Sequence, residues 1–260
     1  MQTPLPLTLL SRIEDAGLNA SAPPQQRWVD GWLVRFSPGK AKRARCINAV
    51  ARGHLPVHEK LALCQRVFEE AQLPLIFRLT PLSEPPMLDG WLESNGLHRF
   101  EDTRVMVNAD LGALNAESLP VGLQMQRVGH TAFAQIVGQM RGSPLSQQQA
   151  HAQRLELSPV PFEGWVLRRA GESAVLACGQ TAIEADLVGL YDVFTTPEAR
   201  NNGLARKLCA QLLERARKRG ARAGYLQVDA SNAAARAVYR HLSFSDGYAY
   251  HYRSPSDQID

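Results

Sequence analysis

The sequence predicts a mixed α/β fold, and three patterns along the chain support this. Strand-like and helix-like segments alternate through the second half, an order that builds a sheet covered by helices. A strand, a long amphipathic helix and another strand lie between Leu187 and Val228. They form a βαβ unit, so its two strands should be parallel neighbours. The first half repeats the later part of this order more weakly, which predicts two related domains.

The elements of the second half follow from apolar periodicity and from turn residues. We expect strands in runs rich in β-branched and aromatic residues, with a hairpin that turns at Ala170-Gly171. The expected strands are Val121–Val128, Gly164–Arg169, Ala174–Thr181, Leu187–Thr195, Tyr225–Val228 and Tyr248–Tyr252. The expected helices are about Thr131–Met140, about Ser146–Leu157, a long helix after Gly203, and one capped by Ser231 or Asn232 that runs through His241.

The long helix has the clearest pattern in the chain. Apolar residues recur at one-turn spacing, and charged or polar residues occupy much of the remaining surface. Gly220 is a natural end for this helix. The apolar positions are Leu204, Leu208, Leu212, Leu213 and Ala216.

The first half matches the later plan in shape without clear identity. Its expected strands are Arg45–Val50, Leu75–Leu79 and Thr103–Val107, and its expected helices are His58–Ala71 and Met87–Asn95. The segment Asn108–Pro120 is the best boundary. We therefore predict domains at residues 1–115 and 116–260.

Composition excludes several classes of protein. The chain has 260 residues, 45% of them hydrophobic and 21% charged, as is typical of a globular protein with a sizeable core. Its four cysteines are scattered in apolar contexts, which favours small buried side chains over disulfides or zinc ligands. No run is long enough to cross a bilayer and the N-terminus lacks a leader pattern, so a cytoplasmic, membrane-free protein is expected.

Nucleic-acid and metal sites are not expected either. The net charge is only +4, and the basic cluster near the end of the long helix has no interleaved aromatic residues, so a solvated surface is preferred. His54 and His58 have the spacing of two helical metal ligands, but Pro56 between them argues against a continuous helix.

The most informative segment joins the Leu187–Thr195 strand to the long helix through Asn201-Asn202-Gly203. Amides at the start of a helix have no partner within the helix, and the helix dipole adds positive potential there. Such a junction binds phosphate, and Gly203 allows the backbone to approach a ligand closely. The alternative from these residues alone is an ordinary turn. The pattern is neither a dinucleotide fingerprint nor a P-loop.

Arg200-x-x-Gly203-x-Ala205 resembles the Gln/Arg-x-x-Gly-x-Gly/Ala loop of the GNAT superfamily of N-acetyltransferases. Downstream, Asn232, Tyr239 and Ser243-Phe244 resemble that family's Asn…Tyr-x-x-x-Gly-Phe helix. The match covers Val121 to Arg253. It implies a GNAT-like acyl-CoA N-acyltransferase fold. The weak repeat resembles tandem GNAT proteins whose N-terminal domain is degenerate.

The resemblance implies a site for acetyl-CoA as cosubstrate, with no metal. Its loop would grip the pyrophosphate, and the end of the preceding strand would hold the pantetheine arm. The implied cofactor-binding residues are Phe194, Thr195, Thr196, Arg200, Asn201, Asn202, Gly203, Leu204, Ala205, Arg206, Asn232 and Tyr239. Two departures stand out: Ser243 replaces the usual glycine, and the region Ala51 to Leu61 lacks the loop, so no second cofactor is expected there.

The implied chemistry is direct attack of a neutral amine on the thioester, which needs a base, oxyanion donors and an acid. Tyr239 matches the family's general acid, although a packed core tyrosine explains it equally well. Asp229 and Asp192 are candidate bases, with a solvated or capping carboxylate as the alternative for each and a water chain as an equal candidate.

The expected acceptor is a primary amine of a small molecule or amino acid, with a protein amine as second choice. A non-catalytic acyl-CoA-binding regulatory module is the alternative function. The chain is expected to be a monomer or a homodimer.

Overall fold

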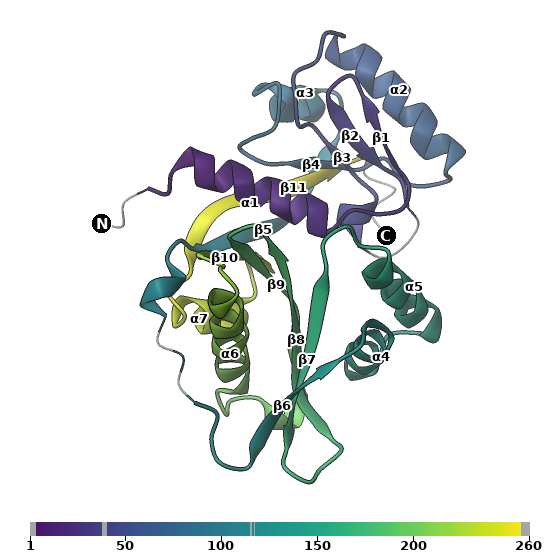
Figure 1. The fold of residues 1–260 in the computed structure, drawn as a ribbon. Coiled ribbons are helices and arrows are strands. Elements are labelled where there is room, and N and C mark those ends of the chain that lie inside the picture. The colour runs from purple at the N-terminus through teal and green to yellow at the C-terminus, as the bar shows by residue number, and fades with distance from the viewer. Residues whose placement is uncertain (1–3, 38–40, 115, 117, 256–260) are drawn as a thin grey trace. The chain divides into compact units, whose positions relative to one another are not determined.

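The computed structural model describes residues 4–37, 41–114, 116 and 118–255, and its contacts divide the chain into two compact units. Unit 1 comprises Met1–Ala20, Val105–Val228 and Asn232–Gly247. Unit 2 comprises Ser21–Arg104, Asp229–Ser231 and Tyr248–Asp260. The units differ from the predicted halves, residues 1–115 and 116–260, because each contains segments from both halves. Figure 1 labels the elements of both units.

Unit 1 is built on a mixed sheet. The strands β6 to β9 pair in sequence order and antiparallel, and β9 then pairs parallel with β10. The parallel pair confirms the predicted βαβ crossover. The strands are β6 (Leu123–Val128), β7 (Phe162–Arg169), β8 (Val175–Glu184), β9 (Leu187–Thr195) and β10 (Ala223–Asp229), whose last residue is counted with unit 2.

Helices cover both faces of this sheet. Figure 1 shows α6 and α7 on one side of the strands and α4 and α5 on the other. One apolar core lies under α6 and α7, and a second lies under α4 and α5. The helices are α4 (His130–Met140), α5 (Leu145–Glu156), α6 (Leu204–Lys218) and α7 (Ala233–Arg240), with short 3-10 turns η2 (Leu111–Ala113) and η3 (Pro197–Ala199).

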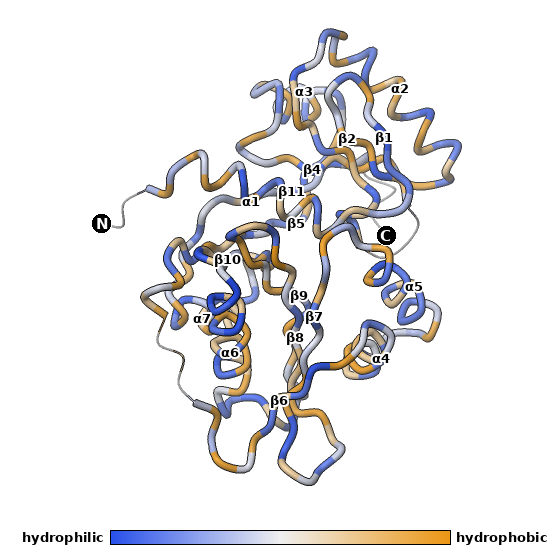
Figure 2. Tube along the Cα trace, in the orientation of Figure 1, coloured by the Kyte–Doolittle hydropathy of each residue, from blue (hydrophilic) through white to orange (hydrophobic). Residues whose placement is uncertain are grey.

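The helix α6 confirms its predicted pattern. All five apolar positions expected to face the core are buried, and Figure 2 shows hydrophobic and hydrophilic residues alternating along it. Gly220 follows the last turn with a φ of 101°, a left-handed conformation that suits glycine.

One helix of unit 1 was not predicted. The helix α1 (Leu7–Ala20) follows Pro6, whose carbonyl accepts hydrogen bonds from the amides of Leu9 and Leu10. Proline is well tolerated at the start of a helix, so here it marks the beginning of an element rather than an interruption. The side chains of Ile13 and Ala16 are buried.

Unit 2 repeats the pairing pattern of unit 1. The strands β1, β2 and β3 pair antiparallel, and β3 then pairs parallel with β4 across the helix α2. The elements are β1 (Gln26–Val29), β2 (Trp32–Arg35), the 3-10 turn η1 (Lys42–Ala44), β3 (Ile47–Asn48), α2 (Val57–Glu70), β4 (Phe77–Leu79) and α3 (Leu88–Ser94). The strands β1 and β2 were not predicted.

The last strand of each sequence half is longer than predicted. The strands are β5 (His98–Asn108) and β11 (Ser245–Ser254). Within unit 2, β11 pairs antiparallel with β4. Residues Val105–Asn108 of β5 belong to unit 1, where Met106 joins the core. The predicted boundary segment, Asn108–Pro120, includes residues 115 and 117, which lie outside the described residues.

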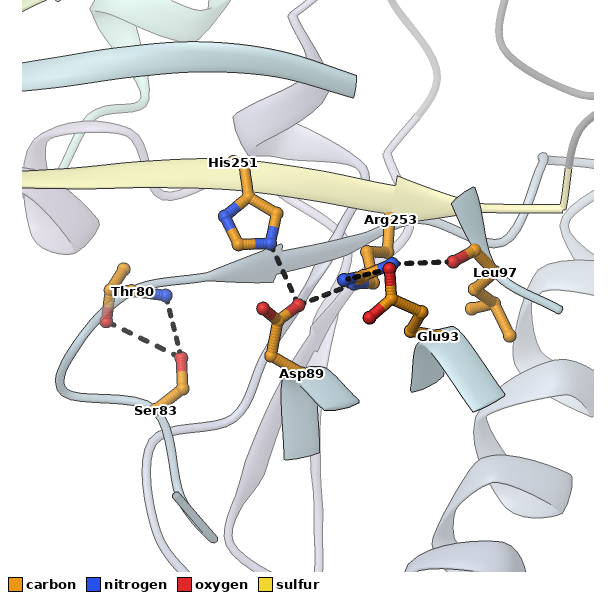
Figure 3. Close-up of polar contacts among 7 residues, drawn as sticks. All are labelled: Thr80, Ser83, Asp89, Glu93, Leu97, His251 and Arg253. Atoms are coloured by element: carbon orange, nitrogen blue, oxygen red, sulfur yellow. Dashed lines mark hydrogen bonds and ion pairs between the residues drawn. The ribbon is translucent and has the colours of Figure 1, made fainter. Parts of the chain in front are cut away.

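The end of β11 is fixed to α3 by a polar cluster in unit 2, drawn in Figure 3. Asp89 accepts hydrogen bonds from Arg253 and from His251, whose Nε2 lies 2.9 Å from the Asp89 Oδ1. Arg253 is buried and also donates to the carbonyl of Leu97 at 2.9 Å. Burial alone would raise the pKa of Asp89, but the hydrogen bonds from Arg253 and His251 outweigh it and lower the pKa.

We predict that Asp89→Asn lowers the free energy of unfolding by about 1 kcal/mol at pH 7, since it leaves the buried Arg253 without its main anionic partner. A carboxyl with a lowered folded-state pKa stabilises the fold above its unfolded pKa of about 3.9. That stabilisation is lost as the pH falls through the folded pKa, so wild type and variant should converge below about pH 4. Urea unfolding at several pH values measures this.

The matched control is Glu93→Gln, because the exposed Glu93 lies 3.5 Å from the same Arg253. It should change stability by less than about 0.5 kcal/mol. Equal effects of the two variants would show that Asp89 is not the anchor of β11.

Candidate functional site

The site lies in unit 1, where β9 and β10 stop pairing. Their parallel register runs from Leu187 opposite Ala223 to Leu190 opposite Leu226. Beyond Leu190, β9 continues to Thr195 and stays paired with β8 on its other edge. Among the described residues, the β10-facing edge of Asp192–Thr195 therefore has no paired strand. Such an edge can bind an extended ligand through main-chain hydrogen bonds.

A bulge in β9 marks the point where the strands separate. Cys178 of β8 lies opposite Phe194, yet Gln180, two residues on, lies opposite Tyr191. The β9 segment therefore holds an extra residue, which bends a strand and increases its twist. Asp192 sits inside this bulge with a φ of 48°, in the left-handed region that few residues other than glycine, asparagine and aspartate adopt.

Two tyrosines join β9 to β10 beside the separation. The hydroxyls of Tyr191 and Tyr225 are 2.9 Å apart, and their rings pack edge to face. Gly189 makes room for them, because a Cβ at this position would lie 2.7 Å from the Tyr225 ring. The glycine therefore permits a tyrosine pair that holds the two strands together just before they part.

The loop from β9 to α6 presents unpaired amides. It runs through η3 and then Asn201 and Gly203, whose φ angles of 62° and 68° are both left-handed. Among the described residues, the amides from Asn201 to Arg206 donate to no acceptor, and α6 has no side-chain cap. A Cβ on Gly203 would meet no atom within 4 Å, so its left-handed φ rather than space is what favours glycine.

Cationic side chains lie around this loop. The Arg200 guanidinium lies 5.8 Å from the centre of the Phe194 ring, and its Nε is 3.4 Å from the Thr195 carbonyl. Arg206 lies half-buried in the first turn of α6. The predicted cofactor-binding residues from Phe194 to Arg206 therefore run from the end of β9 to the first turn of α6, where the helix dipole favours negative charge.

The helix α7 carries the two other predicted residues. Asn232 is its N-cap and accepts a hydrogen bond from the amide of Ala235 at 3.1 Å. Tyr239 is buried against Phe244, and burial, with the nearby Cys209, raises its pKa well above the ordinary value. The phenol is therefore protonated at neutral pH, as a proton donor must be. Ser243, which replaces the usual glycine, adopts a φ of 62°, so the left-handed turn is retained.

The two predicted base carboxylates are both engaged. The Asp229 Oδ1 accepts from the amide of Ser231 at 2.7 Å and from its hydroxyl, and these two bonds lower its pKa. Asp192 accepts from Arg141 at 2.7 Å and from Gln180 at 2.6 Å. Burial alone would raise the pKa of Asp192, but His151 and Arg141 outweigh it and hold the pKa far below its ordinary value.

The partners of Asp192 were not found from the sequence. Arg141 ends α4, His151 lies on α5 and Gln180 lies on β8, so no sequence spacing connects them. The sequence offers one signal for these partners, a polar residue in the middle of an apolar strand, and it applies only to Gln180 in β8.

A protein family described as "Probable histone acetyltransferase Rv0428c C-terminal" matches residues 10–253, nearly the whole chain. The chain belongs to this family. The family match spans both compact units, so the loop before α6 and the repeat in unit 2 are parts of one family pattern.

Solved structures show that this family member has the GNAT fold. A GCN5-related N-acetyltransferase from Kribbella flavida aligns with a TM-score of 0.71 at 17% identity, over 96% of each chain. A tandem GNAT protein from the clavulanic acid biosynthesis pathway aligns with a TM-score of 0.62 at 14% identity, over 77% of this chain and 70% of that one. The predicted fold class, with its tandem resemblance, is confirmed.

A sequence relative supports the same assignment over a shorter stretch. The [ribosomal protein bS18]-alanine N-acetyltransferase of Escherichia coli (strain K12) is 35% identical over 80 residues, which is 31% of this chain. This chain spans about half the length, 53%, of that relative. In the part of the chain that the structure describes, no helix is long and apolar enough to cross a membrane.

We predict that Gly189→Ala lowers the free energy of unfolding by about 1–3 kcal/mol, because the added methyl group overlaps the tyrosine pair. Chemical denaturation measures this. The matched control is Gly90→Ala in α3, where a Cβ would meet nothing within 4 Å. That change should instead stabilise by about 0.5–1 kcal/mol, through helix propensity. A neutral Gly189→Ala would mean that the tyrosines repack freely.

Proposed function

We propose that the chain transfers an acetyl group from acetyl-CoA to a primary amine. The observation that carries this is the combination, in one unit, of six unpaired amides at the start of α6 with an unpaired strand edge that leads to them. An ordinary turn accounts for the loop alone, but it does not account for the end of the pairing between β9 and β10 after Leu190.

The residues fit acetyl-CoA as follows. The amides of Asn201 to Arg206, with the Arg200 side chain, would bind the pyrophosphate, because unpaired donors and the helix dipole both favour anions. The edge of Phe194 to Thr196 would bind the pantetheine amides. Asn232 keeps its amide nitrogen without a partner among the described residues, although its oxygen serves as the N-cap.

The reaction needs a base, donors to the oxyanion and an acid around the thioester. The amine nitrogen forms the new bond to the acetyl carbon, the C–S bond breaks, and the ammonium proton passes to a base. Tyr239 would donate its phenolic proton to the departing thiolate. Backbone amides at the β9 bulge would stabilise the oxyanion.

A water chain suits the base role better than either carboxylate. Asp229 is exposed and is held by Ser231, and both bonds lower its affinity for a proton. Asp192 is held by Arg141, His151 and Gln180. A base needs a vacant lone pair towards the amine and a conjugate acid whose pKa lies near the working pH.

The acceptor is proposed by chemical class. A small-molecule amine or an amino acid is the first candidate, and a protein amine is the second. The named activity of the bS18 alanine acetyltransferase and the histone description of the family favour including peptide N-termini and lysines in a screen.

Unit 2 would not bind a second acetyl-CoA. The counterpart of the phosphate loop, between β3 and α2, holds a carboxylate of its own. Asp30 accepts from the amide of His54 at 2.9 Å and from that of Leu55 at 2.8 Å, and the buried Lys60 ammonium lies 3.3 Å from the same carboxylate. An internal anion thus already occupies the amides that a phosphate would need.

A non-catalytic acyl-CoA-binding regulatory module is the second candidate function. Such a module would bind acyl-CoA through the same loop and strand edge as the proposed acetyltransferase, but it would not turn over. A longer acyl donor is a further variant of the same proposal, which the acyl-chain selectivity of binding would reveal.

We predict that acetyl-CoA binds at one site per chain and that Gly203→Glu abolishes binding, because the variant places a negative charge and an unfavourable left-handed side chain among the amides. Calorimetric titration measures this. The control is Gly122→Glu, another glycine with positive φ and open space around its Cα. If wild type does not bind, the proposed function is refuted.

We predict that Tyr239→Phe lowers kcat by about a hundred-fold or more while acetyl-CoA affinity stays within about threefold, since only the phenolic proton is lost. Thiol release during an amine screen measures turnover. Unchanged turnover would remove Tyr239 from the acid role. Binding without turnover in wild type, across small amines and peptides, would favour the regulatory module.

A further inference from the structure

The Asp192 carboxylate joins four separate elements of unit 1. Its Oδ1 accepts from the Arg141 Nη1 at 2.7 Å, where α4 ends. Its Oδ2 accepts from the Gln180 Nε2 of β8 at 2.6 Å and lies 3.3 Å from the His151 Nε2 of α5. Both oxygens are therefore engaged by hydrogen-bond donors from α4 and β8, and the imidazole of α5 lies within ion-pair distance. The backbone of the same residue forms the bulge of β9.

The three side chains around the Asp192 carboxylate are themselves held in place. Gln180 is almost completely buried, and the His151 ring packs edge to face on Phe133 at 6.5 Å. The Arg141 guanidinium also lies 5.8 Å from the Phe194 ring, on the part of β9 that follows the bulge. A carboxylate fixed from three sides determines the position of its own backbone, which here is in the left-handed conformation.

We infer that Asp192 is a positioning residue that fixes the β9 bulge, through Arg141, His151 and Gln180, and so keeps the strand edge in the shape that binds acetyl-CoA. This inference rests on the proposed function. It gives Asp192 a role other than the base, and it adds Arg141, His151 and Gln180 as residues that act on cosubstrate binding without touching the reacting atoms.

Three features follow one another along β9. Pairing with β10 ends at Leu190, the bulge lies at Asp192, and the unpaired edge runs on to Thr195. Without the bulge, the regular pleat would continue, and β9 could go on pairing with β10 beyond Leu226 to its last residue, Asp229. We call the contacts of Arg141, His151 and Gln180 with the Asp192 carboxylate the clamp. By holding the bulge, the clamp keeps the β10-facing edge of β9 after the bulge unpaired.

A pair of variants separates backbone positioning from acid–base chemistry. Asp192→Gly and Asp192→Ala both remove the carboxylate, but only glycine adopts the left-handed conformation without strain. We expect acetyl-CoA affinity, measured by calorimetry on the full chain, to fall in both, with Asp192→Ala about tenfold weaker than Asp192→Gly. A base would instead leave both variants with wild-type affinity and equally low turnover.

Two further measurements test the clamp. Arg141→Met should weaken acetyl-CoA binding, as the Asp192 variants do. Arg127→Met, which breaks an exposed ion pair with Glu163, should leave binding unchanged.

Asp192→Asn, which tolerates the left-handed backbone, should retain the wild-type pH profile of kcat/KM. Unchanged affinity in the Asp192 and Arg141 variants would overturn the inference. So would loss of the acid limb of the profile with about a hundred-fold lower turnover.

Failure of the proposed function is distinguishable from failure of this inference. If wild type bound no acetyl-CoA, the proposed function would fall. The clamp would then still be tested by thermal unfolding, in which Asp192→Gly should melt above Asp192→Ala. Equal melting temperatures would overturn it.

Discussion

The separation of β9 from β10 beyond Leu190 is the constraint on which the rest of the site depends. In an ordinary parallel pair, the N–H and C=O groups on the facing edges of the two strands hydrogen-bond to each other. Here the bulge at Asp192 bends β9 away, while the hydroxyl pair of Tyr191 and Tyr225 keeps the strands together up to that point. The sheet thus remains stable at one end and offers unpaired donors and acceptors at the other. The loop before α6 then adds its own unpaired amides at the end of the same strand.

The two units show how one topology supports different chemistry. Unit 1 has four strands that pair antiparallel in order and unit 2 has three, and in each unit the last of them pairs parallel with the next strand across a helix. The backbone amides before that helix have different partners in the two units. In unit 1 they are unpaired beside Gly203, and in unit 2 they hold the carboxylate of Asp30. In unit 2 the Asp30 carboxylate takes the amides of His54 and Leu55 as a structural anchor, and the same kind of donor can bind a ligand anion where no internal one is present. Fold therefore does not by itself imply function in unit 2.

Local sequence determined the parts of the fold that depend on near neighbours. The apolar repeat of α6, the strand Leu187–Thr195 and the cap at Asn232 lie where their residues indicated. The missed elements have weaker local signals. The strands β1 and β2 have only four residues each, and the prolines before α1 mark its start. The long strands β5 and β11 extend beyond their predicted bounds because pairing partners, rather than propensity, decide where a strand ends.

The sequence by itself determined the family, the parallel crossover and the strand–loop–helix junction that we propose binds phosphate, because each is written in contiguous residues at fixed spacing. Only the tertiary structure decided what the charged residues do. From the sequence, Asp192 was a candidate base or else a solvated or capping carboxylate. The fold surrounds it with Arg141, His151 and Gln180 from three other elements. The state of a titratable group is set by its neighbours in space. Those neighbours come from segments with no fixed separation in the chain, so a reading of local spacing does not contain them.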